Sequence, residues 1–147
     1  MSRHLRAKSM MMVSVVFGIY SLLWATAPFD AINFPARLIL DSADWPVDNL
    51  FSPLDKETQL LSAIGSGLLA AVAIFLGGIV VPAIREGNRS VIRTTIVAMV
   101  AWYIIDGVGS IASGAGSNVI FNSIYLALVL IPLVGAKKSD EAFRVGT

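Results

Sequence analysis

The stretch that decides the fold runs from Thr94 to Ala136 and reads TTIVAMVAWYIIDGVGSIASGAGSNVIFNSIYLALVLIPLVGA. It holds 43 residues, and Asp106 is its only charged residue. A bilayer core about 30 Å thick is crossed by about 20 helical residues, so this stretch has room for two spans. The small and polar residues from Ser113 to Ser117 predict the turn between them.

Two further apolar runs precede this stretch, Ser9 to Phe29 with 21 residues and Thr58 to Ile84 with 27 residues. The chain is 56% hydrophobic and only 14% charged, which exceeds what a soluble domain of this length needs for its core. We therefore expect an all-α fold, a four-transmembrane-helix bundle that forms a single integral membrane domain over residues 1–147. The expected helices are near residues 10–27, 59–84, 91–112 and 119–136.

The first span has one alternative interpretation, a cleaved secretory signal. Basic residues precede the apolar run, and Ala25-Thr26-Ala27 resembles a small-x-small cleavage site. The run is longer than a signal core of about 7 to 15 residues, and it is aromatic towards its end. These features favour a retained helix.

The basic residues indicate the orientation in the membrane. Nine of the eleven can share one side, because they lie before the first span, between the second and third spans, and after the fourth; these are Arg3, Arg6, Lys8, Arg85, Arg89, Arg93, Lys137, Lys138 and Arg144. Basic loops stay in the cytoplasm. We therefore expect a multi-pass protein of the cell inner membrane with both termini cytoplasmic and the acidic segment 28–57 outside.

The acidic segment is patterned as an interfacial helix over Pro35 to Trp45. Leu38, Ile39 and Trp45 give it an apolar side, while Asp41 and its other charged residues are expected to stay in water. A connector lying on the lipid bilayer is favoured over a lid or a docking surface for an extracytoplasmic partner. After this segment, Ser52 is expected to be the N-cap of the second span.

The second span carries small residues at fourfold spacing, which favour close packing of helices in lipid. One stripe is Ala63, Gly67 and Ala71, and another is Ser62, Ser66 and Ala70. Packing of these small residues within the chain is favoured over self-association or contact with other membrane protein subunits. Further along this span, the pair Gly77-Gly78 and Pro82 predict a bend.

Asp106 is the best candidate for a functional residue, because ionisable groups at membrane depth are costly and mark sites or interhelical hydrogen bonds. Folding the chain around Gly114 places Asp106 level with Asn122 and Ser123, and Ser110 near Asn118. Two readings stay open. The cluster is either a hydrogen-bonded latch between the two helices, which is favoured, or a proton-coupled or cation-binding site completed by Tyr103 or Tyr125.

Several chemistries are excluded by composition. The chain has no cysteine, and its single histidine, His4, lies outside the spans among basic residues. Thiolate catalysis, zinc clusters, iron–sulfur sites and bis-histidine haem are therefore unsupported. No phosphate-binding loop of the G-x-x-x-x-G-K-[ST] type is present. We expect no enzyme activity, no cofactor or metal, and no nucleic-acid partner.

The motif Leu61 to Gly67, followed by Trp102, Asp106 to Gly114 and Asn118, resembles a group of small, uncharacterised four-span proteobacterial membrane proteins. Some of these carry an excinuclease label, which the missing nucleotide loop and zinc cysteines contradict. The resemblance covers roughly Trp45 to Pro132 and implies no known activity. A remoter similarity to DoxX-like four-helix proteins is limited to span count and size.

Two functions follow as expectations. The favoured one is a small noncatalytic inner-membrane protein, structural or accessory within a larger membrane assembly. The alternative is a small proton- or cation-coupled carrier or channel subunit centred on Asp106. A water-accessible cavity at Asp106 would favour transport, and a dry bundle would favour the accessory role.

Overall fold

The computed structural model describes residues 1–134, and every regular element in this range is helical. The elements are α1 (Arg3–Trp24), α2 (Phe34–Ala43), α3 (Lys56–Phe75), the π-helix η1 (Leu76–Val80), α4 (Val81–Glu86), α5 (Arg89–Ala112) and α6 (Gly116–Val134). Four helices are long and apolar enough to cross a membrane: α1, the continuous run Lys56–Glu86, α5 and α6. The expected all-α fold with four helices of spanning length is confirmed.

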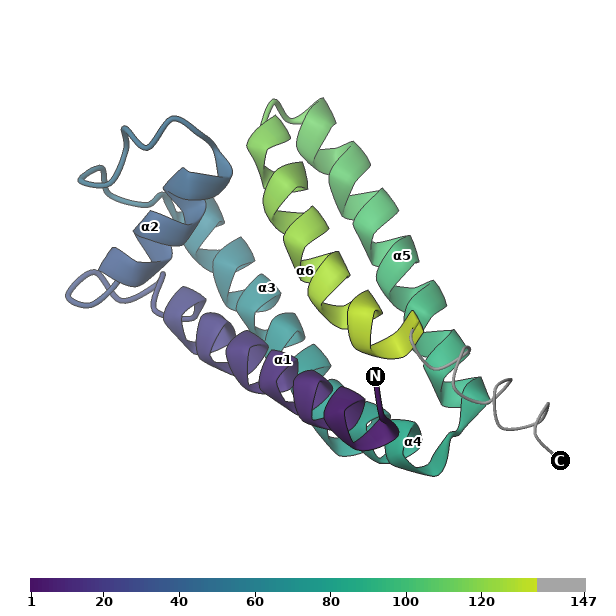
Figure 1. Ribbon diagram of the computed structural model, residues 1–147. Coiled ribbons are helices and arrows are strands. Elements are labelled where there is room, and N and C mark those ends of the chain that lie inside the picture. The colour runs from purple at the N-terminus through teal and green to yellow at the C-terminus, as the bar shows by residue number, and fades with distance from the viewer. Residues whose placement is uncertain (135–147) are drawn as a thin grey trace, which may run out of the picture.

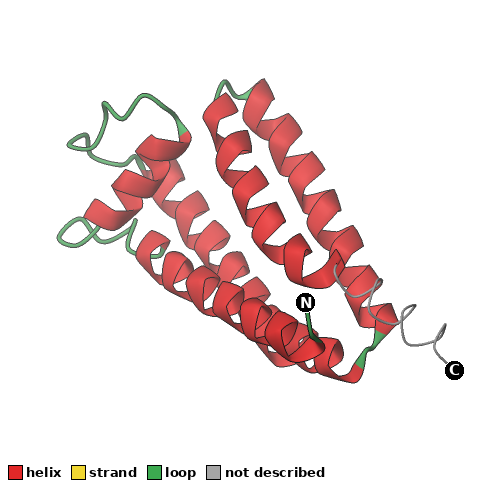
Figure 2. Ribbon diagram, viewed as in Figure 1, coloured by secondary structure: helices red, strands yellow, loops and turns green. Residues whose placement is uncertain are grey.

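Helix α1 is central to the packing. It contacts α3, η1 and α4 on one side and α6 on the other, and α6 pairs in turn with α5 (Figure 1). Helix α2 contacts α1 and α6 and crosses the end of the bundle opposite the N-terminus. Figure 2 shows the longest loops of the described chain beside α2. The core is formed by apolar side chains of α1, the α3–α4 run, α5 and α6.

The start of the first helix differs from the sequence-based bound. Helix α1 begins at Arg3, well before Met10, because Ser2 caps it by accepting a hydrogen bond from the Leu5 N–H at 3.3 Å. Charged residues therefore extend the helix beyond its apolar part. The predicted end of the fourth helix at Ala136, with the basic residues Lys137, Lys138 and Arg144, lies outside the described residues.

Helix α3 is capped by Asp55, so the prediction of Ser52 as the cap is wrong. The Asp55 carboxylate accepts a hydrogen bond from the Thr58 N–H at 2.6 Å. This backbone hydrogen bond lowers the pKa of Asp55. Ser52 instead belongs to a turn, in which its N–H donates to the Asn49 carbonyl at 2.9 Å.

The run from α3 to α4 leaves α-helical geometry at the glycine pair, where the sequence predicts a bend. Pro82 has no N–H, and its ring would clash with the Gly78 carbonyl in a regular helix, so the wider turn of η1 accommodates it. A Cβ atom at Gly77 would lie 2.7 Å from Ser14 Oγ. The Ser14 hydroxyl donates to the Ala73 carbonyl at 2.7 Å, so α1 packs closely here.

Helix α2 occupies most of the predicted segment, with Pro35 in its first turn as expected. Asp41 is buried, which corrects the expectation that it stays in water. The chain after α2 folds back over it, and its carboxylate accepts hydrogen bonds from the N–H groups of Asp48 at 3.4 Å and Asn49 at 3.1 Å. Burial is tolerated because these donors replace water.

Candidate functional site

The candidate site lies in the hairpin formed by α5 and α6. Asp106 and Ser110 are one turn apart on α5, and Asn118 and Asn122 are one turn apart on α6, so each pair shares a helix face. The connecting turn contains Gly114 with φ of +88°, a conformation that glycine adopts without strain. This tight turn places the two pairs opposite each other.

The polar side chains of the four residues converge on one carboxylate oxygen. Asn118 Nδ2 donates to Asp106 Oδ2 at 3.1 Å, and Asn122 Nδ2 donates to the same oxygen. The Ser110 hydroxyl lies 3.5 Å from it and accepts a hydrogen bond from Asn118 Nδ2 at 2.8 Å. We call this group, Asp106, Ser110, Asn118 and Asn122, the Asp106 cluster.

Burial differs within the Asp106 cluster. Asn122 is 5% exposed and Ser110 is 8% exposed, whereas Asp106 and Asn118 are half-buried. Within residues 1–134, every hydrogen bond of the Asp106 side chain goes to Oδ2. These donors replace water around the carboxylate, and they tie α5 to α6.

Ser123, expected beside Asp106, lies outside the cluster. Its hydroxyl donates to the Val119 carbonyl at 2.7 Å and lies 2.9 Å from the Tyr103 hydroxyl. One residue along a helix is a rotation of about 100°, so Ser123 faces away from the direction of Asn122. Tyr125 faces α1 instead, with its ring centroid 5.6 Å from that of Phe17.

Ser117 is a site neighbour that sequence reasoning missed. Its hydroxyl donates to the Ala43 carbonyl at 2.5 Å and accepts a hydrogen bond from the Trp45 N–H at 3.2 Å. It therefore fixes the end of α2 to the start of α6, directly before Asn118. Its partners are more than 70 residues away in the chain, so no local pattern indicates them.

The small-residue stripes of α3 are placed differently from expectation. Ser62 and Ser66 are buried and Ala70 is half-buried, whereas Ala63, Gly67 and Ala71 are exposed; the expectation that the latter stripe packs within the chain is therefore wrong. The reason lies at Gly65, where a Cβ atom would collide with the Trp24 ring of α1. The Trp24 indole packs directly against the α3 backbone at Gly65.

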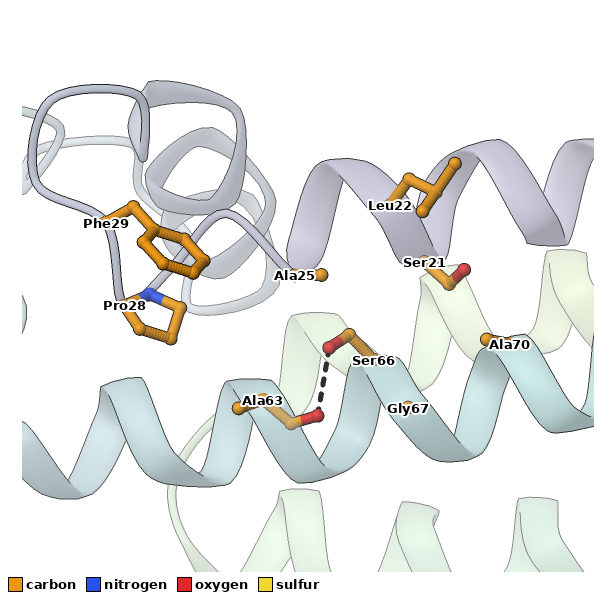
Figure 3. Close-up of a pocket in the computed structure, with 9 residues that line it drawn as sticks. All are labelled: Ser21, Leu22, Ala25, Pro28, Phe29, Ala63, Ser66, Gly67 and Ala70. Atoms are coloured by element: carbon orange, nitrogen blue, oxygen red, sulfur yellow. Dashed lines mark hydrogen bonds between the residues drawn. The ribbon is translucent and has the colours of Figure 1, made fainter.

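An open groove of about 290 Å³ lies beside the exposed stripe, between α1 and α3 (Figure 3). Its lining residues are Ser21, Leu22, Ala25, Pro28, Phe29, Ala63, Ser66, Gly67 and Ala70. The Ser66 hydroxyl donates to the Ala63 carbonyl at 3.0 Å, and the Ser21 hydroxyl donates to the Gly18 carbonyl at 2.8 Å. Both hydroxyls are satisfied within their own helices, so the groove suits an apolar occupant.

A second buried polar contact joins the two ends of the described chain. Arg6 is 1% exposed; its Nε donates to the Pro132 carbonyl at 2.6 Å and its Nη2 to the Leu133 carbonyl at 3.3 Å. These carbonyls lie in the last described turn of α6. We call this contact between Arg6 and the Pro132 and Leu133 carbonyls the Arg6 clamp. The sequence indicated Arg6 only as one of the basic residues that set the orientation in the membrane, and it did not predict the clamp.

Neither a metal-binding group nor a known relative assigns a function to the site. Residues 1–134 contain no group of three or more histidine, cysteine, aspartate or glutamate side chains placed to hold a metal ion. No protein-family model, curated protein or solved structure matches the chain.

The latch reading makes a prediction for Asp106. Asp106→Asn is expected to leave stability nearly unchanged, because a carboxamide oxygen still accepts from Asn118 and Asn122. Asp106→Leu is expected to lower the free energy of unfolding by about 1 kcal/mol, because buried donors lose their acceptor. Thermal unfolding in detergent measures both, with the exposed Val108→Leu as the control. Equal destabilisation by asparagine and leucine would contradict the latch.

Proposed function

We propose that this protein is a small noncatalytic membrane protein that serves as a structural or accessory subunit of a larger membrane assembly. The observation that carries the proposal is the exposed stripe of Ala63, Gly67 and Ala71 on a helix of spanning length. Lipid supplies no hydrophobic drive between helices, so small residues that allow close backbone approach are a main source of association.

The groove supports the same role. Ala63 and Gly67 belong both to the exposed stripe and to the groove, so a helix that packs on the stripe can place a side chain in the groove. The satisfied hydroxyls of Ser21 and Ser66 make an apolar side chain the suitable occupant. The partner is a membrane helix of another subunit or of a second copy.

The Asp106 cluster serves in this proposal as the latch that fixes the α5–α6 hairpin. The side-chain amides of Asn118 and Asn122 donate hydrogen bonds to the Asp106 carboxylate of the same chain, as in a structural hydrogen-bond network. The groove is lined by α1, α3 and the residues after α1, so it lies away from this cluster.

The proposed orientation places both termini in the cytoplasm of a cell with an inner membrane. The N-terminus and the α4–α5 turn, with their basic residues, lie at the same end of the bundle, and α2 lies at the other (Figure 1). In this orientation α2 lies at the outer membrane surface, where its exposed Phe34 and Leu38 contact lipid. Reporter fusions in the α4–α5 turn check the orientation, and an external position would overturn it.

Cysteine cross-linking tests the accessory role, because the chain has no cysteine of its own. We expect Gly67→Cys, in intact membranes, to form cross-links to a partner subunit or to a second copy with a bifunctional thiol or thiol–amine reagent. The control is Ile104→Cys, an exposed position on α5 away from the groove. Similar cross-linking at both positions, or none at Gly67→Cys, would count against a specific interface at the stripe.

A further inference from the structure

Arg37 on α2 has a buried donor without an acceptor. Within residues 1–134, two buried side-chain polar atoms lack a hydrogen-bond partner, Nε of Arg37 and Nε1 of Trp24. The indole of Trp24 is neutral, whereas the guanidinium of an arginine is always charged and carries five N–H donors. Buried donors are nearly always paired, and leaving a charged group unpaired is the more costly case. Arg37 therefore points to an acceptor that the described chain does not supply.

Neither the orientation in the membrane nor a neighbouring carboxylate accounts for Arg37. It is not among the nine basic residues that can share the cytoplasmic side. Asp41 lies one turn further along α2, at a spacing where opposite charges can pair. Both oxygens of Asp41 instead accept a hydrogen bond from the Asn49 N–H at 3.1 Å. Asp41 thus holds the chain that follows α2, and Arg37 Nε donates no hydrogen bond to it.

Arg37 lies on the border between two sides of α2. Asn33 and Ala36 are buried, Phe34 and Leu38 are exposed, and Arg37 between these sides is half-buried. A long basic side chain in this position keeps its apolar stem on apolar surface and its charged group at the level of the lipid headgroups. Phosphate groups lie at that level, and a guanidinium binds phosphate through two parallel N–H donors.

A negative charge lies close to the start of the same helix. Asp30 is exposed, and its Oδ1 accepts a hydrogen bond from Asn33 Nδ2 at 3.3 Å. Asn33 precedes Arg37 by four residues, or about 6 Å along a helix axis. The exposed Asp44 and Asp48 add negative charge to this part of the chain, which disfavours an anionic headgroup. The charges therefore match a headgroup that carries both a phosphate and an ammonium group.

From these contacts we propose that Arg37 binds the phosphate of a zwitterionic phospholipid, with the ammonium group of the lipid beside Asp30. The Nε of Arg37 is covered by protein atoms, so its guanidinium turns towards the headgroups as the phosphate binds. The exposed Phe34 and Leu38 contact the acyl chains of the same lipid layer. The assignment of this layer to the outer leaflet rests on the proposed orientation.

Thermal unfolding of the purified full-length protein in detergent tests the site. We expect the midpoint to be several degrees higher with added phosphatidylethanolamine than with diacylglycerol of the same acyl chains, because a ligand that binds the folded state stabilises it. Arg37→Gln removes the charge and is expected to abolish this difference. Equal midpoints for the wild type with the two lipids, or a difference retained in Arg37→Gln, would overturn the proposal.

Lys56→Gln is the matched control, because Lys56 is the other basic residue of segment 28–57 and is exposed. It is expected to keep the effect of phosphatidylethanolamine, and loss of the effect in this variant would show that any basic residue of the segment suffices. Native mass spectrometry of the wild type needs no folded variant. We expect phosphatidylethanolamine to stay bound where diacylglycerol is lost, and equal loss of both would also overturn the site.

Two further comparisons identify the headgroup. Phosphatidylglycerol is expected to stabilise the wild type less than phosphatidylethanolamine, and Asp30→Asn is expected to remove this preference. A stronger effect of phosphatidylglycerol would refute the role of Asp30. Inorganic phosphate alone is expected to leave the midpoint unchanged, and a shift as large as that with the lipid would show a site for free phosphate instead. Detergent micelles have no inner or outer side, so these results do not depend on the orientation or on cross-linking at Gly67→Cys.

Discussion

Arg6→Ala is expected to lower the free energy of unfolding by about 2 to 3 kcal/mol, the size of lost charge-assisted hydrogen bonds in a buried site. Arg6 is almost fully buried and donates to the carbonyls of Pro132 and Leu133. Alanine would leave both carbonyls without this donor.

Unfolding in detergent by heat or denaturant measures this loss. Arg6→Lys is expected to recover only part of it, because an ammonium group lacks the planar fork that donates to two neighbouring carbonyls. Lys8→Ala, an exposed basic residue on the same helix, is the matched control and is expected to change stability by less than about 0.5 kcal/mol. Equal effects of Arg6→Ala and Lys8→Ala would show that general charge, and not the clamp, stabilises this end.

Gly65→Ala is expected to destabilise the protein by about 1 to 3 kcal/mol, the usual cost of overpacking. The added Cβ would lie 2.9 Å from Cζ3 and 3.0 Å from Cζ2 of the Trp24 indole, which are shorter than van der Waals contacts. Either the ring or α3 must move. Alanine stabilises a helix by about 1 kcal/mol relative to glycine. The clash must exceed this gain before the free energy of unfolding falls.

Gly67→Ala is the matched control, because it lies on the same helix and nothing lies within 4 Å of its added Cβ. It is expected to be neutral or stabilising in the same unfolding measurement. Combining Gly65→Ala with Trp24→Ala should cost less than the sum of the two single changes, because the ring that clashes is gone. Strict additivity in this cycle would mean that the contact between Gly65 and Trp24 does not set the packing.

The sequence by itself determined the number of helices of spanning length and all four members of the Asp106 cluster, with Ser123 as one residue too many. The stretch of 43 residues has one charge, and two helices satisfy its backbone N–H and C=O groups internally, as a lipid environment would require. Once the chain turns at Gly114, residues at equal distances from the turn meet. Asp106 and Asn122 are therefore brought together by local geometry alone.

Helix rotation was decided only by the tertiary structure. Ser66 and Gly67 differ by one position, or about 100° around α3, and both are small enough for close packing, so composition does not choose between their faces. The choice is made by side chains of α1, with Trp24 against Gly65 and Ser14 against Gly77. The Arg6 clamp likewise needs carbonyls at the far end of the chain. Such contacts depend on which helices become neighbours, and hydropathy carries no information about that.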